Sequence, residues 1–227
     1  MESTYEMLLS LPLFQGVSRE RLLEVIEKTP FHFLKFQDGA TVAAAGERCD
    51  NLRFIISGSV RLETASRSRR VTVGETLSSP GVIGPEYLFG LDTNYPFCAT
   101  ARGACGIMQV TKASYMSILM SDPIFVINVL NILSRNSQRG AANALALSSG
   151  SVAERLAHFV LTLTHQGARE ITVTFRQKDL CAVLGTQRTS LMTALSRLAD
   201  EGVITYSGNE IAIPDRSRLA DILNAQA

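Results

Sequence analysis

Short apolar runs separated by glycines fill the chain up to about residue 112. Regular turn residues between strands of about four to eight residues are typical of a small β-barrel or sandwich. Two helices are expected before these strands, at residues 4–9 and 18–28, and Ser18 is placed to cap the second. The expected strands cover residues 41–44, 51–56, 59–63, 70–73 and 105–110.

The pattern changes near residue 113, where glycines become rare. A long helix is expected from Pro123 to about residue 147, because Asp122 offers an N-cap and proline is favoured at the first helical position. Apolar and small residues recur along it in alternating steps of four and three, a heptad seam of about three repeats. Such a seam fits either a helix packed on its own domain or a parallel dimerisation helix. The seam residues are Val126, Leu130, Leu133, Ser137, Gly140, Ala144 and Leu147.

Small polar residues at 148–150 interrupt the helical pattern and predict a hinge. The predicted organisation is therefore a domain of residues 1–147 that ends in the long helix (about 123–147), the hinge, and a second domain of residues 151–227.

The second domain alternates helices and strands in an order that indicates a winged helix-turn-helix, in which two helices joined by a tight turn precede a β-hairpin. The fold class predicted for the whole chain is α+β. The expected elements are a helix at 152–164, a strand at 170–174, helices at 177–184 and from the cap Thr186 to about 201, and a hairpin of residues 203–206 and 210–213.

The second helix of this pair has the features of a DNA recognition helix. Leu191, Leu195 and Leu198 share one face and are expected in the core, which leaves the opposite face exposed. Arg188, in the first turn, suits a bidentate contact with guanine, whereas other basic side chains suit phosphates. The candidate DNA-binding residues are Arg176, Lys178, Thr186, Gln187, Arg188, Thr189, Ser190, Thr193 and Arg197.

Composition narrows the classes of function. The chain has 227 residues, 46% hydrophobic and 19% charged, with a net charge of +1, which excludes a uniformly basic coat for nucleic acid. Charge is nevertheless polarised: residues 169–197 carry five basic and two acidic side chains, whereas residues 198–227 carry two basic and five acidic ones. No apolar run approaches the ~20 residues of a membrane span. Acidic residues near the N-terminus do not fit a signal peptide, so a cytoplasmic location without membrane contact is expected.

Metal-based catalysis is not predicted. The four cysteines lack C-x-x-C spacing and the three histidines form no ligand pair, which argues against a zinc site or a cupin-like oxygenase on the β-domain. We therefore do not expect an enzyme.

Two separate sets of motifs resemble the Crp/Fnr family of bacterial transcription regulators. The run 179–191, with Leu198 and residues 201–204, resembles the family's helix-turn-helix; residues 39–60, 80–84 and 99–102 resemble its cyclic-nucleotide-binding β-roll, a jelly-roll-like double-stranded β-helix. The resemblance implies a cytoplasmic homodimer that binds a two-fold DNA operator, acts with RNA polymerase as an activator, and responds to an effector bound in the β-roll.

The β-roll departs from the cAMP-binding members. Tyr95-Pro96 stands where the resemblance places a phosphate-binding Arg-Ser pair, and Gly140-Ala141 replaces the Thr-Ser pair that contacts adenine; tyrosine brings no positive charge and proline no backbone donor. The sequence therefore argues against cAMP. The candidate residues of the effector pocket are Gly84, Glu86, Phe89, Tyr95, Pro96, Phe97, Cys98, Gly140 and Ala141.

Other effectors stay open. An iron–sulfur cluster is not expected, because no cysteine precedes Cys49. Haem ligation by His32 with Cys98 or Cys105, redox sensing through one of these thiols, a small apolar ligand or gas, and an empty pocket all remain alternatives. The recognition helix also differs from the family pattern, since Thr189 stands where the family often has the glutamate that accepts from cytosine. This departure predicts a half-site unlike the family's best-known consensus, with the guanine read by Arg188 retained. A winged-helix interaction module that does not bind DNA is a further alternative, because a solvated helix has the same pattern.

Overall fold

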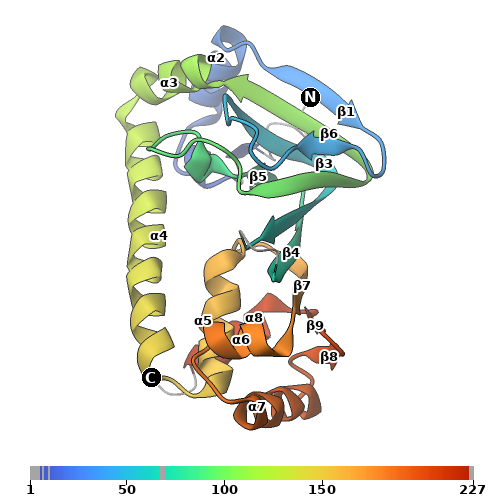
Figure 1. Cartoon of the computed structure of the whole chain (residues 1–227). Coiled ribbons are helices and arrows are strands. Elements are labelled where there is room, and N and C mark those ends of the chain that lie inside the picture. The colour runs from blue at the N-terminus through green and yellow to red at the C-terminus, as the bar shows by residue number, and fades with distance from the viewer. Residues whose placement is uncertain (1–5, 7, 10, 67–69, 225–227) are drawn as a thin grey trace. The chain divides into compact units, whose positions relative to one another are not determined.

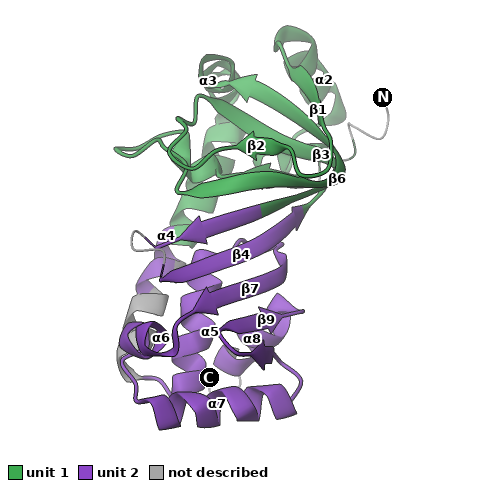
Figure 2. Cartoon of the chain, turned by 45° about the vertical axis from the view of Figure 1, so that its right-hand side comes forward, with its two compact units in different colours: residues 1–61, 78–136 green, residues 62–77, 137–227 purple. Residues whose placement is uncertain are grey.

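The computed structural model describes residues 6, 8–9, 11–66 and 70–224, which fall into two compact units (Figure 2). Unit 1 contains residues 1–61 and 78–136, and unit 2 contains residues 62–77 and 137–227. This division differs from the boundary expected from sequence, because residues 62–77 group with the C-terminal residues. The side chains of residues 139 and 142–149 are outside the described part, and with them the seam positions Ala144 and Leu147.

Antiparallel strands form the core of unit 1. In it β6 (Phe97–Thr111) lies between β1 (His32–Phe36) and β3 (Asn51–Ala65), while β2 (Thr41–Ala43) pairs with β6 and β5 (Gly81–Ile83) pairs with β3. Side chains that alternate along β3 and β6 point inward and are almost completely buried. They include Leu52, Phe54, Val60, Phe97, Ala99, Ala101, Ile107 and Val110.

Two expected strands, 51–56 and 59–63, are one strand, β3, because Gly58 does not end it. Gly58 has a φ of +75° within the strand, and a Cβ there would collide with the carbonyl oxygen of Ala104 on β6. This glycine therefore permits a close approach of two long strands rather than a turn. The expected strand 105–110 is likewise only the second half of β6, and β1 and β5 were not predicted.

Short helices cover unit 1 and lead into the long helix. The predicted helix at 18–28 is confirmed as α2 (Arg19–Lys28), and the Ser18 hydroxyl accepts from the amide of Arg21 at 3.2 Å. Residues 6, 8 and 9 are helical, and the rest of the predicted helix 4–9 is outside the described residues. The remaining helical segments are η1 (Pro12–Phe14), η2 (Pro85–Tyr87) and α3 (Lys112–Ser121).

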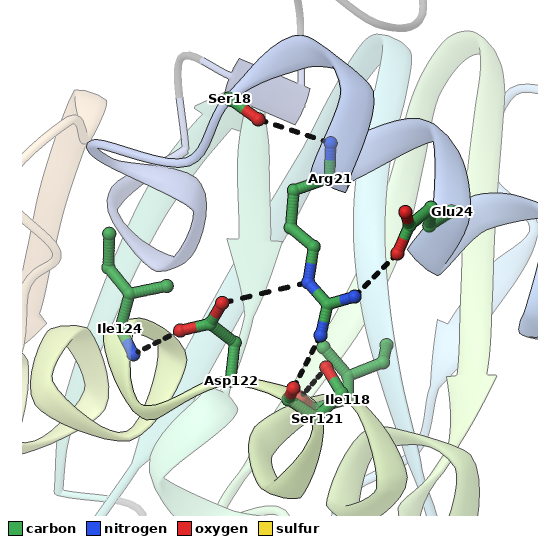
Figure 3. Close-up of polar contacts among 7 residues, drawn as sticks. All are labelled: Ser18, Arg21, Glu24, Ile118, Ser121, Asp122 and Ile124. Atoms are coloured by element: carbon green, nitrogen blue, oxygen red, sulfur yellow. Dashed lines mark hydrogen bonds and ion pairs between the residues drawn. The ribbon is translucent and has the colours of Figure 1, made fainter.

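Arg21 joins α2 to the junction between α3 and the long helix that begins at Pro123 (Figure 3). Its guanidinium donates to the carbonyl oxygen of Ser121 and pairs with Glu24 at 2.5 Å and with Asp122 at 3.6 Å. Asp122 in turn accepts from the amide of Ile124 at 3.0 Å, which confirms it as the cap at the start of the long helix. One arginine thus fixes where three helices meet.

The long helix α4 (Pro123–Ser149) is unbroken in Figure 1 and ends two residues later than predicted. Residues 148 and 149 are still helical, so the expected hinge is reduced to Gly150, which precedes the cap Ser151 of the next helix. Among the described residues, no single helix is long and apolar enough to cross a membrane; α3 and residues 123–138 meet that test only as a pair, and they are bent by 113°.

Unit 2 is a winged helix extended by one hairpin. Its strands lie in the order end of β3, β4 (Val71–Ser78), β7 (Arg169–Phe175), β9 (Glu210–Ile213) and β8 (Thr205–Ser207). Its core contains leucines that are predicted correctly on the recognition helix, since Leu191, Leu195 and Leu198 are at most 1% exposed. The other elements are α5 (Val152–Leu163), α6 (Gln177–Val183), α7 (Arg188–Asp200) and α8 (Arg216–Asn224).

Three expectations for unit 2 need correction. Helix α7 begins at Arg188, and its N-cap is Gln187 rather than Thr186, without a bond from the side chain. The first hairpin strand begins at Thr205 instead of residue 203. Helix α8 was not predicted, because its few apolar positions give a weak helical pattern in the sequence. In the structure, its residue Leu219 is fully buried.

Candidate nucleic-acid interface

Helices α6 and α7 are held at a fixed angle by the turn between them. Leu180 and Leu184 are buried on the α6 side, and the amide of Thr186 donates to the carbonyl of Cys181 at 3.0 Å. Arg155 of α5 donates to the carbonyls of Leu184 and Gly185 at 2.7 and 3.1 Å. These bonds use the carbonyls that a helix leaves free at its C-terminus, so the turn is rigid.

The face of α7 opposite the buried leucines is exposed. Arg188 is exposed in the first turn, and Thr189, Ser190 and Thr193 are exposed as well, with Thr189 and Thr193 opposite Leu191 by helical spacing. Helix α7 has no acidic residue in its first turn, so its positive N-terminal end is not neutralised locally. An exposed helix N-terminus with one arginine and three hydroxyl side chains matches what a recognition helix presents to a major groove.

A shallow hollow of about 390 Å³ lies between this face and the start of α5. One wall is formed by Ser151, Val152 and Ala153, and the other by residues of α7. Ser151 and Glu154 form a capping box, with bonds of 3.3 and 3.0 Å. The α7 residues of the wall are Thr189, Ser190, Thr193, Ala194 and Arg197.

The structure therefore brings together four of the nine predicted DNA-binding residues at one hollow. Thr189, Ser190, Thr193 and Arg197 line the hollow, whereas Thr186 is half-buried in the turn. Two of them have internal partners as well: the Thr193 hydroxyl donates to the carbonyl of Thr189 at 3.0 Å, and Arg197 lies 3.5 Å from Glu201.

The other predicted basic residues, Arg176 and Lys178, are exposed at the start of α6, with Arg176 in the N-cap position. Sequence reasoning missed the wall made by residues 151–153, because it predicted a helix from residue 152 but gave it no part in DNA binding. The pattern Ser151-x-x-Glu154 was the available signal, since it is a capping box that marks the start of a helix.

In unit 1, several of the predicted pocket residues form an aromatic cluster. The rings of Tyr95 and Phe97 are 5.2 Å apart, and Tyr87 packs edge-on against both. Tyr95 is only 1% exposed. A Cβ on Gly84 would lie 2.8 Å from Phe97, so a glycine is needed for the chain to approach the rings. Where the resemblance places a cationic phosphate site, this chain has packed aromatic side chains.

Tyr95 is also held by polar contacts. Its hydroxyl accepts from the Cys49 thiol at 3.0 Å and donates to the carbonyl of Asn51 at 3.5 Å. Arg53 lies over the ring, 5.7 Å from its centre, and pairs with Glu47 at 2.7 Å. Burial alone would raise the pKa of Glu47, but the amide of Ala44 and the guanidinium of Arg53 outweigh it and lower that pKa. The Arg53 charge is thus already neutralised by a carboxylate.

The remaining pocket candidates are dispersed. Glu86, Phe89 and Pro96 are exposed, and Cys98 is half-buried. Gly140 and Ala141 belong to unit 2, where both are exposed and nothing lies within 4 Å of a Cβ built on Gly140.

Two of the four thiols are poorly suited to redox chemistry. Burial raises the pKa of Cys49 and of Cys105, which reduces the reactive thiolate form. Within the described residues, no three His, Cys, Asp or Glu side chains are grouped so that they could hold a metal ion.

Two family models match the chain in sequence order: "cyclic nucleotide-binding domain" at residues 33–122 and "Crp-like helix-turn-helix domain" at residues 154–222. The chain is 28% identical over 227 residues to a CRP-like cAMP-activated global transcriptional regulator of Mycobacterium tuberculosis, covering 95% of this chain and 97% of the relative. It is 24% identical over 216 residues to a cyclic AMP receptor protein of Thermus thermophilus, covering 93% and 96%.

The fold agrees with these matches. The crystal structure of the Thermus thermophilus catabolite activator protein superimposes with a TM-score of 0.54 at 21% identity, covering 96% of this chain and all of that one. A cyclic-nucleotide-binding-like β-roll thus precedes a Crp-like helix-turn-helix, and the homologues are transcription regulators rather than enzymes. The chain belongs to the Crp/Fnr family of transcription regulators.

Proposed function

We propose that this protein is a homodimeric regulator that recognises a two-fold DNA operator with α7 and acts with RNA polymerase. The observation that carries the proposal is the exposed face of α7, where Thr189, Ser190 and Thr193 line the hollow at the start of α5 and Arg188 is exposed in the first turn. Arg188 is assigned to a guanine in the major groove. The exposed basic residues Arg176 and Lys178 are assigned to phosphates, together with Arg197 at the hollow.

The assignment is tested with the DNA site that the wild-type chain selects from random duplexes. Arg188→Ala is expected to lose about 1–3 kcal/mol of specific binding and to relax the preference at one base pair. Lys178→Ala is expected to weaken all sequences equally and to lower the slope of log K against log salt by about 1. Arg19→Ala, an exposed arginine on α2, is the matched control. Equal site preference in wild type and Arg188→Ala would contradict the role of Arg188, and a folded wild type that selects no site would overturn the DNA-binding function.

For the effector, we propose that the β-roll does not bind cAMP in the manner implied by its relatives' names. The support is local: Tyr95 is buried among aromatic rings, and the charge of the nearby Arg53 is already paired with Glu47. We propose a small apolar ligand or a gas as the effector instead, because the side chains around Tyr95 are aromatic.

A further inference from the structure

Residues 62–66 and 70–77 form a hairpin arm that groups with the DNA-binding residues of unit 2. In sequence the arm lies inside the match to the cyclic nucleotide-binding domain, residues 33–122. It is built from the end of β3 and from β4, and the Ser66 hydroxyl links the two by accepting from the amides of Arg70 and Val71 at 3.1 and 3.2 Å. The arm therefore belongs to the β-roll by sequence but groups with unit 2 in the structure.

The arm pairs with the winged helix along most of one strand. β4 runs antiparallel to β7 from Val71 opposite Phe175 to Thr76 opposite Arg169 (Figure 2). The other edge of β7 pairs with β9, so β7 would be an edge strand without the arm. An uncovered edge exposes a row of unpaired backbone groups and favours wrong pairing. The arm therefore completes the sheet of the DNA-binding unit that contains α7.

Side chains from three positions of the arm fix it to this sheet. Glu75 is 4% exposed; its carboxylate accepts from the backbone amide of His165 at 2.7 Å and lies 2.8 Å from the Nδ1 atom of the same residue. The Thr76 hydroxyl donates to Glu170 at 3.2 Å, and Arg70 lies 3.7 Å from Asp179 in the first turn of α6. The arm thus contacts the end of α5, the start of β7 and the first helix of the helix-turn-helix.

The backbone of β7 is shaped to accept the arm. The pairing register shifts between Gly74 and Thr76, opposite Glu170, and Glu170 has a φ of +48°. A non-glycine residue in this region is strained and persists only where surrounding contacts impose it. Here the imposed conformation lets the Glu170 side chain meet Thr76 while Glu75 turns to His165.

We propose that the arm works by strand complementation: it supplies in cis the outer strand of the DNA-binding sheet, so that full operator affinity requires the arm to be docked. Because β3 is one continuous strand from Asn51 to Ala65, the arm is joined to the rest of the β-roll sequence without an intervening loop. A conformational change in the β-roll that shifts β3 is then transmitted through the arm to α6 and α7.

Hydrogen exchange measured on the whole chain tests whether the arm is docked on β7. In wild type, the amides of β4 and β7 are expected to be protected together. Glu75→Ala, which removes both contacts to His165, is expected to raise exchange in both strands at once while β8 remains paired to β9. Glu210→Ala, an exposed carboxylate on β9, is the matched control. Rapid exchange along β7 in wild type, or exchange of β4 alone in Glu75→Ala, would overturn the proposal.

A disulfide between the arm and β7 tests whether the arm pairs with β7 of its own chain. Thr72 and Thr174 are paired residues, so cysteines at both positions are close enough for a disulfide. Oxidation is expected to give an intramolecular bond, seen as a monomer on a non-reducing gel; the two single-cysteine variants control for the native thiols. A covalent dimer would mean that the arm pairs in trans and would overturn complementation in cis.

Operator binding gives the functional result, and this part rests on the proposed DNA-binding function. Glu75→Ala is expected to bind the selected site about tenfold more weakly, because only the docked fraction is competent. The oxidised Thr72→Cys/Thr174→Cys pair is expected to restore affinity in the Glu75→Ala background. Unchanged affinity, or no rescue on oxidation, would overturn the coupling. A wild type that binds no DNA would instead refute the DNA-binding function and leave the exchange and cross-link results to decide the docking.

Discussion

At the scale of single residues, Tyr95 sets the chemistry of the predicted effector pocket, because its buried side chain stands where the resemblance places an arginine. The absence of an arginine at this position was visible from the sequence, and it argued against cAMP. The partners of the tyrosine were not visible, because Cys49 and Arg53 reach it from more than forty residues away. Such long-range contacts have no local sequence signal, and only the fold brings them together.

Tyr95 also provides a test of the effector pocket. Since its ring is buried and Arg53 is neutralised by Glu47, titration of the wild-type protein with cAMP in a calorimeter is expected to give no saturable binding up to millimolar ligand. The positive control is a cAMP-binding relative under the same conditions. Saturable binding that is lost in Tyr95→Ala would contradict the proposal for the effector.

At the scale of elements, the sequence predicted the positions of helices better than the lengths of strands. Caps such as Ser18 and Asp122 are local signals, and both make the expected bonds. Strands β3 and β6 were divided or shortened, because Gly58 and Gly103 were taken as turn residues although both lie within continuous strands. A glycine that serves close strand approach cannot be told from a turn glycine by sequence alone.

The junction of α2, α3 and α4 yields a prediction at the same scale. Arg21→Ala removes a charged donor from the Ser121 carbonyl and an ion pair with Asp122, and it is expected to lower the free energy of unfolding by about 1–2 kcal/mol, since the side chain is part-exposed. Arg21→Lys is expected to recover less than half of this, because an ammonium lacks the planar fork that reaches both partners. Chemical denaturation measures both, with Arg19→Ala as the control. A loss in Arg21→Ala no larger than in Arg19→Ala would contradict the role of the junction.

At the scale of the whole molecule, the order of the parts was predictable and the assignment of residues 62–77 was not. The hydrophobic pattern placed these residues with the β-strands of the first domain, and the family match does the same. Their pairing with β7 is a contact across about one hundred residues of sequence. The order of the two domains along the chain therefore does not reveal that one hairpin groups with the C-terminal unit.

The long helix carries the last prediction, because DNA recognition at a two-fold site needs two copies of α7. In the single chain, Leu130 and Leu133 on the predicted seam of α4 are 56% and 50% exposed. Burying a leucine fully stabilises by about 1.5–3 kcal/mol, and a dimer doubles the number buried. Leu130→Glu is therefore expected to shift the protein from dimer to monomer in sedimentation at micromolar concentration and to abolish binding to a two-half-site duplex. Arg135→Glu, nearly opposite the seam by helical spacing, is expected to remain dimeric. A Leu130→Glu protein that sediments as the wild-type dimer would place the dimer interface elsewhere.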